Sequence, residues 1–321
     1  MVNGKTCWRA TLSSKKKKNR FLQKIRRYLI YLIAMIFRRI LLILPWPLSF
    51  RIGEKMGGMI YFLLPHEKKK ALNNLSTAFG DKKSKGELRR IAREVFRNAG
   101  RSMAEILCWP RLGKKYLKNN VTIKHPERLL NAFEEGKGVI GLTAHFGNWE
   151  FMASSLANRL DIRFTVIARQ ISNPYLNEWI QENRKSMGIR YIYRGKGGSA
   201  ILRCLKKNEG LGILADQNIR GEGVYVEFFG KRTKTLKSVA DLIYRSKAKV
   251  VPLFMIRNKE LTKHTLIVEN PLDFVVSDNK EDDLKNIAQT YSNIIESYIC
   301  RYPEQWMWMH SRWGRNKEAK R

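Results

Sequence analysis

The residues with the clearest potential for chemistry are a histidine and a glutamate in the segment Thr143-Ala-His-Phe-Gly-Asn-Trp-Glu150. An imidazole can take up a proton near neutral pH, and a carboxylate beside one ring nitrogen orients the ring and stabilises its charged form. In one continuous helix, side chains five positions apart diverge by about 140° and do not meet. At a corner between a strand and a helix they can meet. We therefore predict that His145 and Glu150 form a general-base pair at such a corner.

The residues around this pair narrow the chemistry. Gly147 allows close approach of the backbone, and amides at the start of a following helix can face a developing oxyanion. A metal site is not expected, because one histidine and one glutamate are too few ligands and the four cysteines are scattered. A nucleophilic serine is not expected either, because the chain has no G-x-S-x-G elbow. The alternative for His145 is a structural role at a helix cap or in the core.

Short apolar runs alternate with helical patterns from residue 121 onward. We expect strands at residues 138–144, 163–168, 210–215, 249–256 and 262–269. We expect helices at residues 149–159, 175–187, 199–207, 238–246 and 281–301. This alternation predicts an α/β fold with a central mixed, largely parallel sheet flanked by helices.

Polar residues follow three of these predicted strands: His145, Arg169 and Asp216. Ligands of open parallel sheets bind at the carboxyl ends of strands, so we expect these three side chains to converge. Arg169 suits a clamp on a phosphate or a thioester carbonyl, and the alternative is a structural salt bridge with Asp216.

The chain has a strongly positive net charge, and most of the excess of basic residues lies in its first 120 residues. The 321 residues include 62 Lys and Arg against 28 Asp and Glu, and residues 1–120 alone hold 29 of those bases and 6 of those acids. A basic cluster from Lys15 to Arg27 precedes the apolar run 28–37, which Arg38 and Arg39 interrupt. This pattern favours a helix that lies in a membrane interface and docks on anionic lipid. The alternative is a solvated basic tail.

We divide the chain into a basic membrane-anchoring segment (1–53), a helical region (54–120) and an α/β catalytic domain (121–315). In the helical region, one basic amphipathic helix places Leu88, Ile91, Ala92, Val95 and Phe96 on one face. Nucleic acid is not expected as a partner, because none of the usual binding modules can be recognised.

The motif from His145 to Glu150 resembles the HX4(D/E) motif of the lysophospholipid acyltransferase superfamily, and specifically the bacterial lipid A biosynthesis acyltransferases. Four further segments agree with that family in order and spacing, namely residues 168–174, 212–217, 226–230 and 303–313. The resemblance covers roughly residues 25–315. Two departures are Thr235-Leu236, where the family commonly has a Thr-Pro pair, and the long lysine-rich extension before Phe21.

The resemblance implies an acyltransferase that moves a fatty acyl chain from acyl carrier protein, or coenzyme A, to a hydroxyl of a lipid A precursor without a further cofactor. His145 and Glu150 would be catalytic. The residues implied to bind substrate are Gly147, Arg169, Asn173, Asp216 and Gln217. The implied partners are acyl carrier protein, anionic membrane lipid and a glycolipid acceptor, at the cytoplasmic face of the bacterial inner membrane.

Three alternatives to this function remain open. In the first two, the same acyl transfer has a lysophospholipid or another phosphorylated glycolipid as its acceptor. In the third, the protein is a basic lipid-binding protein without catalysis. For the aromatic carboxyl-terminal segment with Trp306, Trp308, His310 and Trp313, the choice lies between a packed cap and a belt that contacts lipid.

Overall fold

The computed structural model describes the backbone of residues 4–195, 197–218, 222–274 and 277–313, and side chains from residue 21 onward. The first part of the chain is helical and contains α1 (Gly4–Ile43), α2 (Trp46–Leu63), α3 (Pro65–Phe79), α4 (Lys85–Leu107) and α5 (Trp109–Asn120). The remainder alternates between strands and helices: β1 (Val121–Lys124), α6 (Pro126–Glu134), β2 (Val139–Thr143), α7 (Trp149–Arg159), β3 (Phe164–Ala168), α8 (Pro174–Ser186), β4 (Arg190–Tyr193), α9 (Gly198–Lys206), β5 (Gly210–Leu214), β6 (Gly223–Phe228), β7 (Lys231–Leu236), α10 (Lys237–Ser246), β8 (Lys249–Arg257), β9 (His264–Val268) and α11 (Lys280–Arg301).

Seven strands form one sheet in the order β1-β9-β8-β2-β5-β3-β4, and β6 and β7 form a separate hairpin. Neighbours in the large sheet run parallel except for β8 and β9, which are antiparallel. The predicted α/β fold with a mixed, largely parallel sheet flanked by helices is therefore confirmed. The sequence patterns missed β1, α6, β4 and the β6–β7 hairpin.

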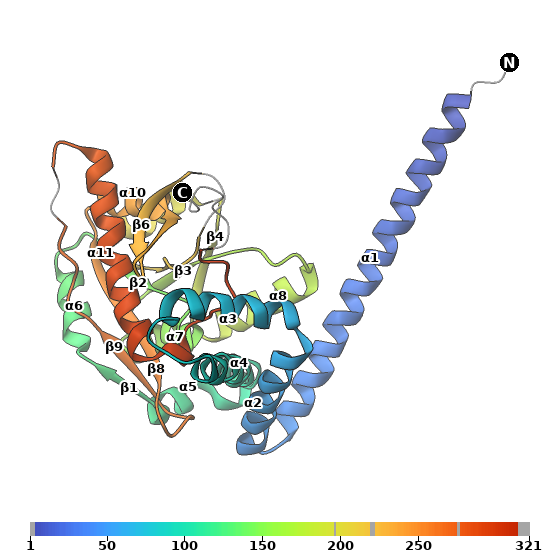
Figure 1. Cartoon of the computed structure of the whole chain (residues 1–321), viewed down its shortest axis with the longest axis horizontal. Helices are drawn as coiled ribbons and strands as arrows, with labels where there is room; N and C mark the ends of the chain where they lie inside the picture. The colour runs from blue at the N-terminus through green and yellow to red at the C-terminus, as the bar shows by residue number, and fades with distance from the viewer. Residues whose placement is uncertain (1–3, 196, 219–221, 275–276, 314–321) are drawn as a thin grey trace.

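Helices cover both faces of the sheet (Figure 1). Successive residues of a strand point to opposite faces, and in β8 Val250 and Phe254 join a core cluster with α3, α4, α10 and α11, whereas Val251 and Leu253 join a second cluster with α5, α6 and α7. The helices α2 to α4 thus share a core with the sheet. The predicted boundaries at residues 53 and 120 stay a prediction.

The helix α4 carries the predicted amphipathic face, and the five apolar residues predicted to lie on that face are all buried. It begins at a capping box, in which Ser84 and Glu87 satisfy each other's backbone amides. Glycines let α2 and α4 approach closely: a Cβ atom on Gly57 would lie 2.2 Å from the carbonyl oxygen of Phe96. This close packing holds α4 in place beside the carboxyl ends of the strands.

The long helix α1 leaves the body of the molecule toward its amino-terminal end, and its later half lies along α2 and α8 (Figure 1). Arg38, one of the two arginines in the apolar run, is half-buried and packs 5.9 Å from the ring of Trp179 on α8. Among the helices of the described residues, none combines the length and apolar content needed to cross a bilayer. The basic side chains from Lys15 to Arg20 lie outside the described residues, so the membrane-associated region stays a prediction.

Candidate active site

His145 lies at the predicted corner between β2 and α7, and its closest ionic partner is Asp216. The ring Nδ1 is 2.9 Å from Oδ1 of Asp216, and the backbone N–H of His145 donates to Oδ2 of the same carboxylate at 2.9 Å. The strands β2 and β5 are neighbours in parallel register, with Thr143 opposite Leu214. The residues two positions beyond each strand end therefore meet, as expected for His145 and Asp216.

The carboxylate of Asp216 is fully buried, whereas the ring of His145 remains 17% exposed. Trp306 donates its indole N–H to Oδ2 of Asp216 at 2.7 Å. Burial by itself would raise the pKa of Asp216, but the charge of His145 and the hydrogen bonds from His145 and Trp306 lower that pKa below its ordinary value. An ionised Asp216 accepts the hydrogen of Nδ1 and leaves the lone pair on Nε2 of His145 to act as a base.

Glu150 does not have the partner that we predicted. It lies in the first turn of α7, and Arg184 on α8 donates to it through Nε at 3.1 Å and Nη2 at 2.5 Å. Burial by itself would lower the pKa of Arg184, and the hydrogen bond and charge of Glu150 raise it. Among the described residues, the ring nitrogens of His145 contact Asp216 and Gln217. The predicted hydrogen bond from His145 to Glu150 is therefore wrong, because the Glu150 carboxylate binds Arg184 on α8 instead.

Gly147 has the predicted close approach, but to another strand. Its φ is +55°, and a Cβ atom would lie 1.8 Å from the carbonyl oxygen of Met255 in β8. Its own N–H donates to the carbonyl oxygen of Gln305 at 2.8 Å. The glycine therefore fits the loop between β8 and the carboxyl-terminal segment, and its amide is already occupied.

The structure does not bring Arg169 to the pair. Arg169 is exposed, and β3 is separated from β2 by β5 in the sheet. The salt bridge proposed as its alternative role is wrong, since Asp216 pairs with His145.

Asn173 has its polar atoms engaged elsewhere. Its side chain caps α8 by accepting from the N–H of Tyr175, and its Nδ2 donates to the carbonyl oxygen of Arg27 in α1 at 2.9 Å. Asn173 therefore links α1 to the start of α8.

Two further side chains, those of Gln217 and His310, lie beside the ring of His145. Gln217 Nε2 lies 3.3 Å from His145 Nε2 and 3.4 Å from His310 Nε2. The rings of His145 and His310 are 4.8 Å apart between centroids. Burial, followed by the charge of His145, lowers the pKa of His310 to about 4, so this ring is neutral at pH 7. The sequence analysis left His310 without a catalytic role, and its only signal was its place in the aromatic segment.

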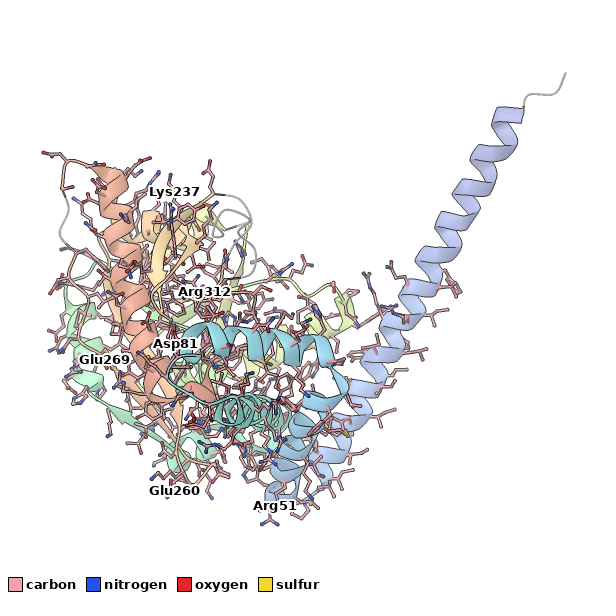
Figure 2. All side chains as sticks on the ribbon, in the orientation of Figure 1. Arg51, Asp81, Lys237, Glu260, Glu269 and Arg312 are labelled. Atoms are coloured by element: carbon pink, nitrogen blue, oxygen red, sulfur yellow. The ribbon has the colours of Figure 1, made fainter. Side chains whose placement is uncertain are left out.

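That aromatic segment is a packed cap. Trp306 and Trp308 are 1% and 0% exposed, and Arg312 is equally buried in the body of the molecule (Figure 2). Asn74 on α3 holds the segment, donating to the carbonyl oxygens of Trp308 at 2.7 Å and His310 at 2.5 Å. Of the two roles considered for the tryptophans, packing is confirmed for these two.

An apolar cavity of about 160 Å³ opens beside His145. One wall is the α4 face with Val95, Ala99, Met103 and Ile106, and the other is the segment with Trp306, Met307 and Met309. Met103 lines the cavity and is itself 50% exposed. The cavity therefore offers a hydrocarbon-sized space within reach of a base.

A buried ionic network that the sequence analysis missed lies behind the site. Glu105 accepts from Arg257 at 2.9 and 2.7 Å, from the Nε2 of His264 at 2.8 Å and from Asn148 at 2.8 Å. Asn148 in turn caps α7 by accepting from the N–H of Phe151. This carboxylate thus ties the loop after His145 to α4, β8 and β9.

In the described part of the chain, no three His, Cys, Asp or Glu side chains lie together in a way that could hold a metal ion. The arrangement of His145 and Asp216 is instead that of an oriented imidazole base.

Comparison with known proteins identifies the family of this chain. The sequence model of the family described as bacterial lipid A biosynthesis acyltransferase matches residues 15–315. A lipid A biosynthesis acyltransferase of Haemophilus influenzae is 26% identical over 81% of this chain and 81% of its own length. The lipid A biosynthesis palmitoleoyltransferase of Escherichia coli is 24% identical over 84% and 86%. A phosphatidylinositol mannoside acyltransferase of Mycolicibacterium smegmatis is 22% identical over 58% and 60%.

Proposed function

This chain belongs to the bacterial lipid A biosynthesis acyltransferase family and is an acyltransferase, and we propose that it transfers a fatty acyl chain from a carrier thioester to a hydroxyl of a lipid A precursor. The observation that carries the proposal is the buried Asp216 carboxylate on Nδ1 of a partly exposed His145. This pair leaves Nε2 as the base. It replaces the predicted pair, with Asp216 in the orienting role that we assigned to Glu150.

In the proposed reaction, the acceptor hydroxyl binds at Nε2 of His145. Its oxygen attacks the thioester carbonyl carbon and forms the new C–O bond, while its proton moves to Nε2. The tetrahedral intermediate then collapses, the C–S bond breaks, and the leaving sulfur takes the proton from the imidazolium. Asp216 stabilises that imidazolium throughout. The transfer needs no cofactor and forms no covalent acyl-enzyme.

The cavity between α4 and the carboxyl-terminal segment supports a fatty acyl donor. Its walls are mainly aliphatic, aromatic and thioether side chains, and His145 lies at its edge. Burying an acyl chain there removes apolar surface from water, which is favourable by about 25 cal/mol per Å². We infer that the chain lies in this cavity with its thioester at His145.

The exposed face of α1 supports a membrane location. Seven exposed apolar residues follow one another at intervals of three or four positions, the spacing of one helix face: Leu22, Ile25, Leu29, Ile33, Ile36, Ile40 and Ile43. Lys24, Arg26 and Arg27 accompany this stripe at its start. A helix of this kind lies in the interface and is held by apolar burial and anionic lipid. We propose the cytoplasmic face of the bacterial inner membrane, where acyl carrier protein delivers the donor.

The mycobacterial relative motivates a second acceptor class, a mannosylated phosphoinositide, which the same base and cavity can serve. Mass spectrometry of products formed from acyl carrier protein thioesters with each purified acceptor decides between the two. Product from the phosphoinositide alone would overturn the lipid A assignment and retain the chemistry.

The central test is the variant His145→Ala in detergent-solubilised full-length protein. Removal of a positioned base should lower turnover by at least about 10²-fold. Asp216→Asn should also lower it sharply, because an amide favours the wrong imidazole tautomer. His66→Ala changes an exposed histidine and is the matched control. Near-normal transfer by His145→Ala would show that the base is elsewhere, and a lipid-binding protein without catalysis would show no transfer in any variant.

A further inference from the structure

The amide of Gln217 lies between two imidazoles, and the hydrogen-bonding pattern fixes its orientation. Asp216 accepts the hydrogen on Nδ1 of His145, so Nε2 presents a lone pair. The group 3.3 Å from that lone pair is the amide nitrogen of Gln217, which carries two hydrogens. A carboxamide oxygen there would oppose lone pair to lone pair. Gln217 must therefore turn its NH2 toward His145.

The second hydrogen of this NH2 points to His310. The His310 ring is mostly buried, and its Nε2 lies 3.4 Å from the amide nitrogen. A neutral imidazole accepts at this nitrogen if its own hydrogen is on Nδ1. Asn74 donates to the backbone carbonyl oxygens of Trp308 and of His310 itself, so the backbone that carries the accepting ring is held in place. A neutral ring here also spares His145 the repulsion of a neighbouring cation.

Both contacts are longer than the usual 2.9–3.0 Å of a strong hydrogen bond, so the one to His145 is easily exchanged. An acceptor hydroxyl that binds Nε2 of His145 displaces that N–H. The thioester carbonyl must then lie about 3 Å from the hydroxyl oxygen. Because Nε2 of Gln217 lies 3.3 Å from Nε2 of His145, its released N–H is within reach of a carbonyl oxygen at that position, whereas the amide of Gly147 is occupied by Gln305.

We propose that Gln217 is a catalytic residue that donates its displaced N–H to the oxyanion of the tetrahedral intermediate, and that His310 is a positioning residue that holds the amide by accepting its second hydrogen. Gln217 moves no proton in this step. The inference rests on the proposed acyl transfer, and it assigns a role to a histidine that the general-base mechanism does not use.

The experiment compares kcat and KM for Gln217→Ala, His310→Ala and His310→Gln with the wild type, using a long-chain acyl carrier protein thioester. Loss of an oxyanion donor lowers kcat by about 10²–10³-fold and leaves KM within about twofold. His310→Ala should lower kcat about tenfold, and His310→Gln should recover part of the loss, since a side-chain oxygen can accept from Gln217. Gln170→Ala changes an exposed glutamine and is the control.

A rise in KM with unchanged kcat in Gln217→Ala would overturn the proposal in favour of acceptor binding, and unchanged constants would exclude both roles. A second readout does not depend on activity. In the full-length wild type, 15N spectra of the imidazoles should show the Nδ1–H tautomer for His145 and for His310 at pH 7, and Gln217→Ala should weaken that preference at His310. An Nε2–H tautomer at His310 would refute the inference, whether or not lipid A is the acceptor.

Discussion

The buried carboxylate of Glu105 is expected to be costly to neutralise. The side chains of Glu105 and His264 are 0% exposed and that of Arg257 is 3% exposed. Burial would raise the pKa of Glu105, but Arg257 and His264 lower it far below the value of a free glutamate. The variant Glu105→Gln keeps the shape and removes the charge, which leaves the Arg257 guanidinium buried without a counter-charge.

Breaking a buried ion pair from one side costs about 3–5 kcal/mol. For chains of this size, each kcal/mol lowers the melting temperature by about 2–4 °C. Glu105→Gln should therefore lower the Tm by about 10 °C. Since Glu105 also holds Asn148 beside the base, turnover should fall even well below the Tm. The sign of the pH dependence follows from the lowered pKa: the contribution of Glu105 is fully present above the pKa of a free glutamate, about 4.3, and is lost progressively as the pH falls from there through the lowered pKa.

Circular dichroism melts in detergent measure this effect, with Glu127→Gln as the control because Glu127 is an exposed partner of His125. The control should shift the Tm by less than about 2 °C, as exposed pairs contribute about 0–1 kcal/mol. A double variant, Glu105→Leu with Arg257→Met, should regain much of the lost stability, because it removes both buried charges. A Tm for Glu105→Gln within 2 °C of the wild type would refute the reasoning.

Three further predictions concern the loop, the membrane helix and the second histidine. Gly147→Ala should abolish activity and lower the Tm far more than Gly230→Ala, because both have positive φ but only the first Cβ meets a backbone oxygen within 2 Å; equal losses would show that strain in φ is sufficient. Ile33→Glu should weaken binding to anionic vesicles in a flotation assay, whereas Leu130→Glu, an exposed apolar residue on α6, should not; equal binding by both variants would argue against the stripe. Burial lowers the pKa of His310 to about 4, so only the unfolded chain takes up this proton as the pH falls from about 6.5 to about 4. The wild type should therefore lose about 1–3 kcal/mol of its free energy of unfolding over that range. Denaturation series in which the free energy of unfolding of His310→Asn falls with pH as steeply as that of the wild type would contradict this.

Elements with a strong local pattern were predictable from the sequence. The periodic apolar face of α4 and the continuous apolar run of β2 are each visible within one short window of sequence. The missed elements lack such a pattern: β7 reads Lys-Arg-Thr-Lys-Thr-Leu, and β1 and β4 are four-residue edge strands. These strands are stabilised by pairing and by neighbouring elements, which no window of sequence contains.

The candidate site divides in the same way. The sequence by itself determined that a histidine follows a buried strand at a sharp corner, since the apolar run, Gly147 and the start of α7 are all encoded within twelve residues. It also determined which polar residues follow the other strands. The partner of His145, however, was decided by tertiary structure: Glu150 is five positions away and turns to Arg184, whereas Asp216 is 71 positions away and binds Nδ1. The physical reason is that a local pattern specifies the path of the backbone, while the side chains that meet are chosen by strand order and register, and only the pairing of β2 with β5 puts these two strand ends side by side.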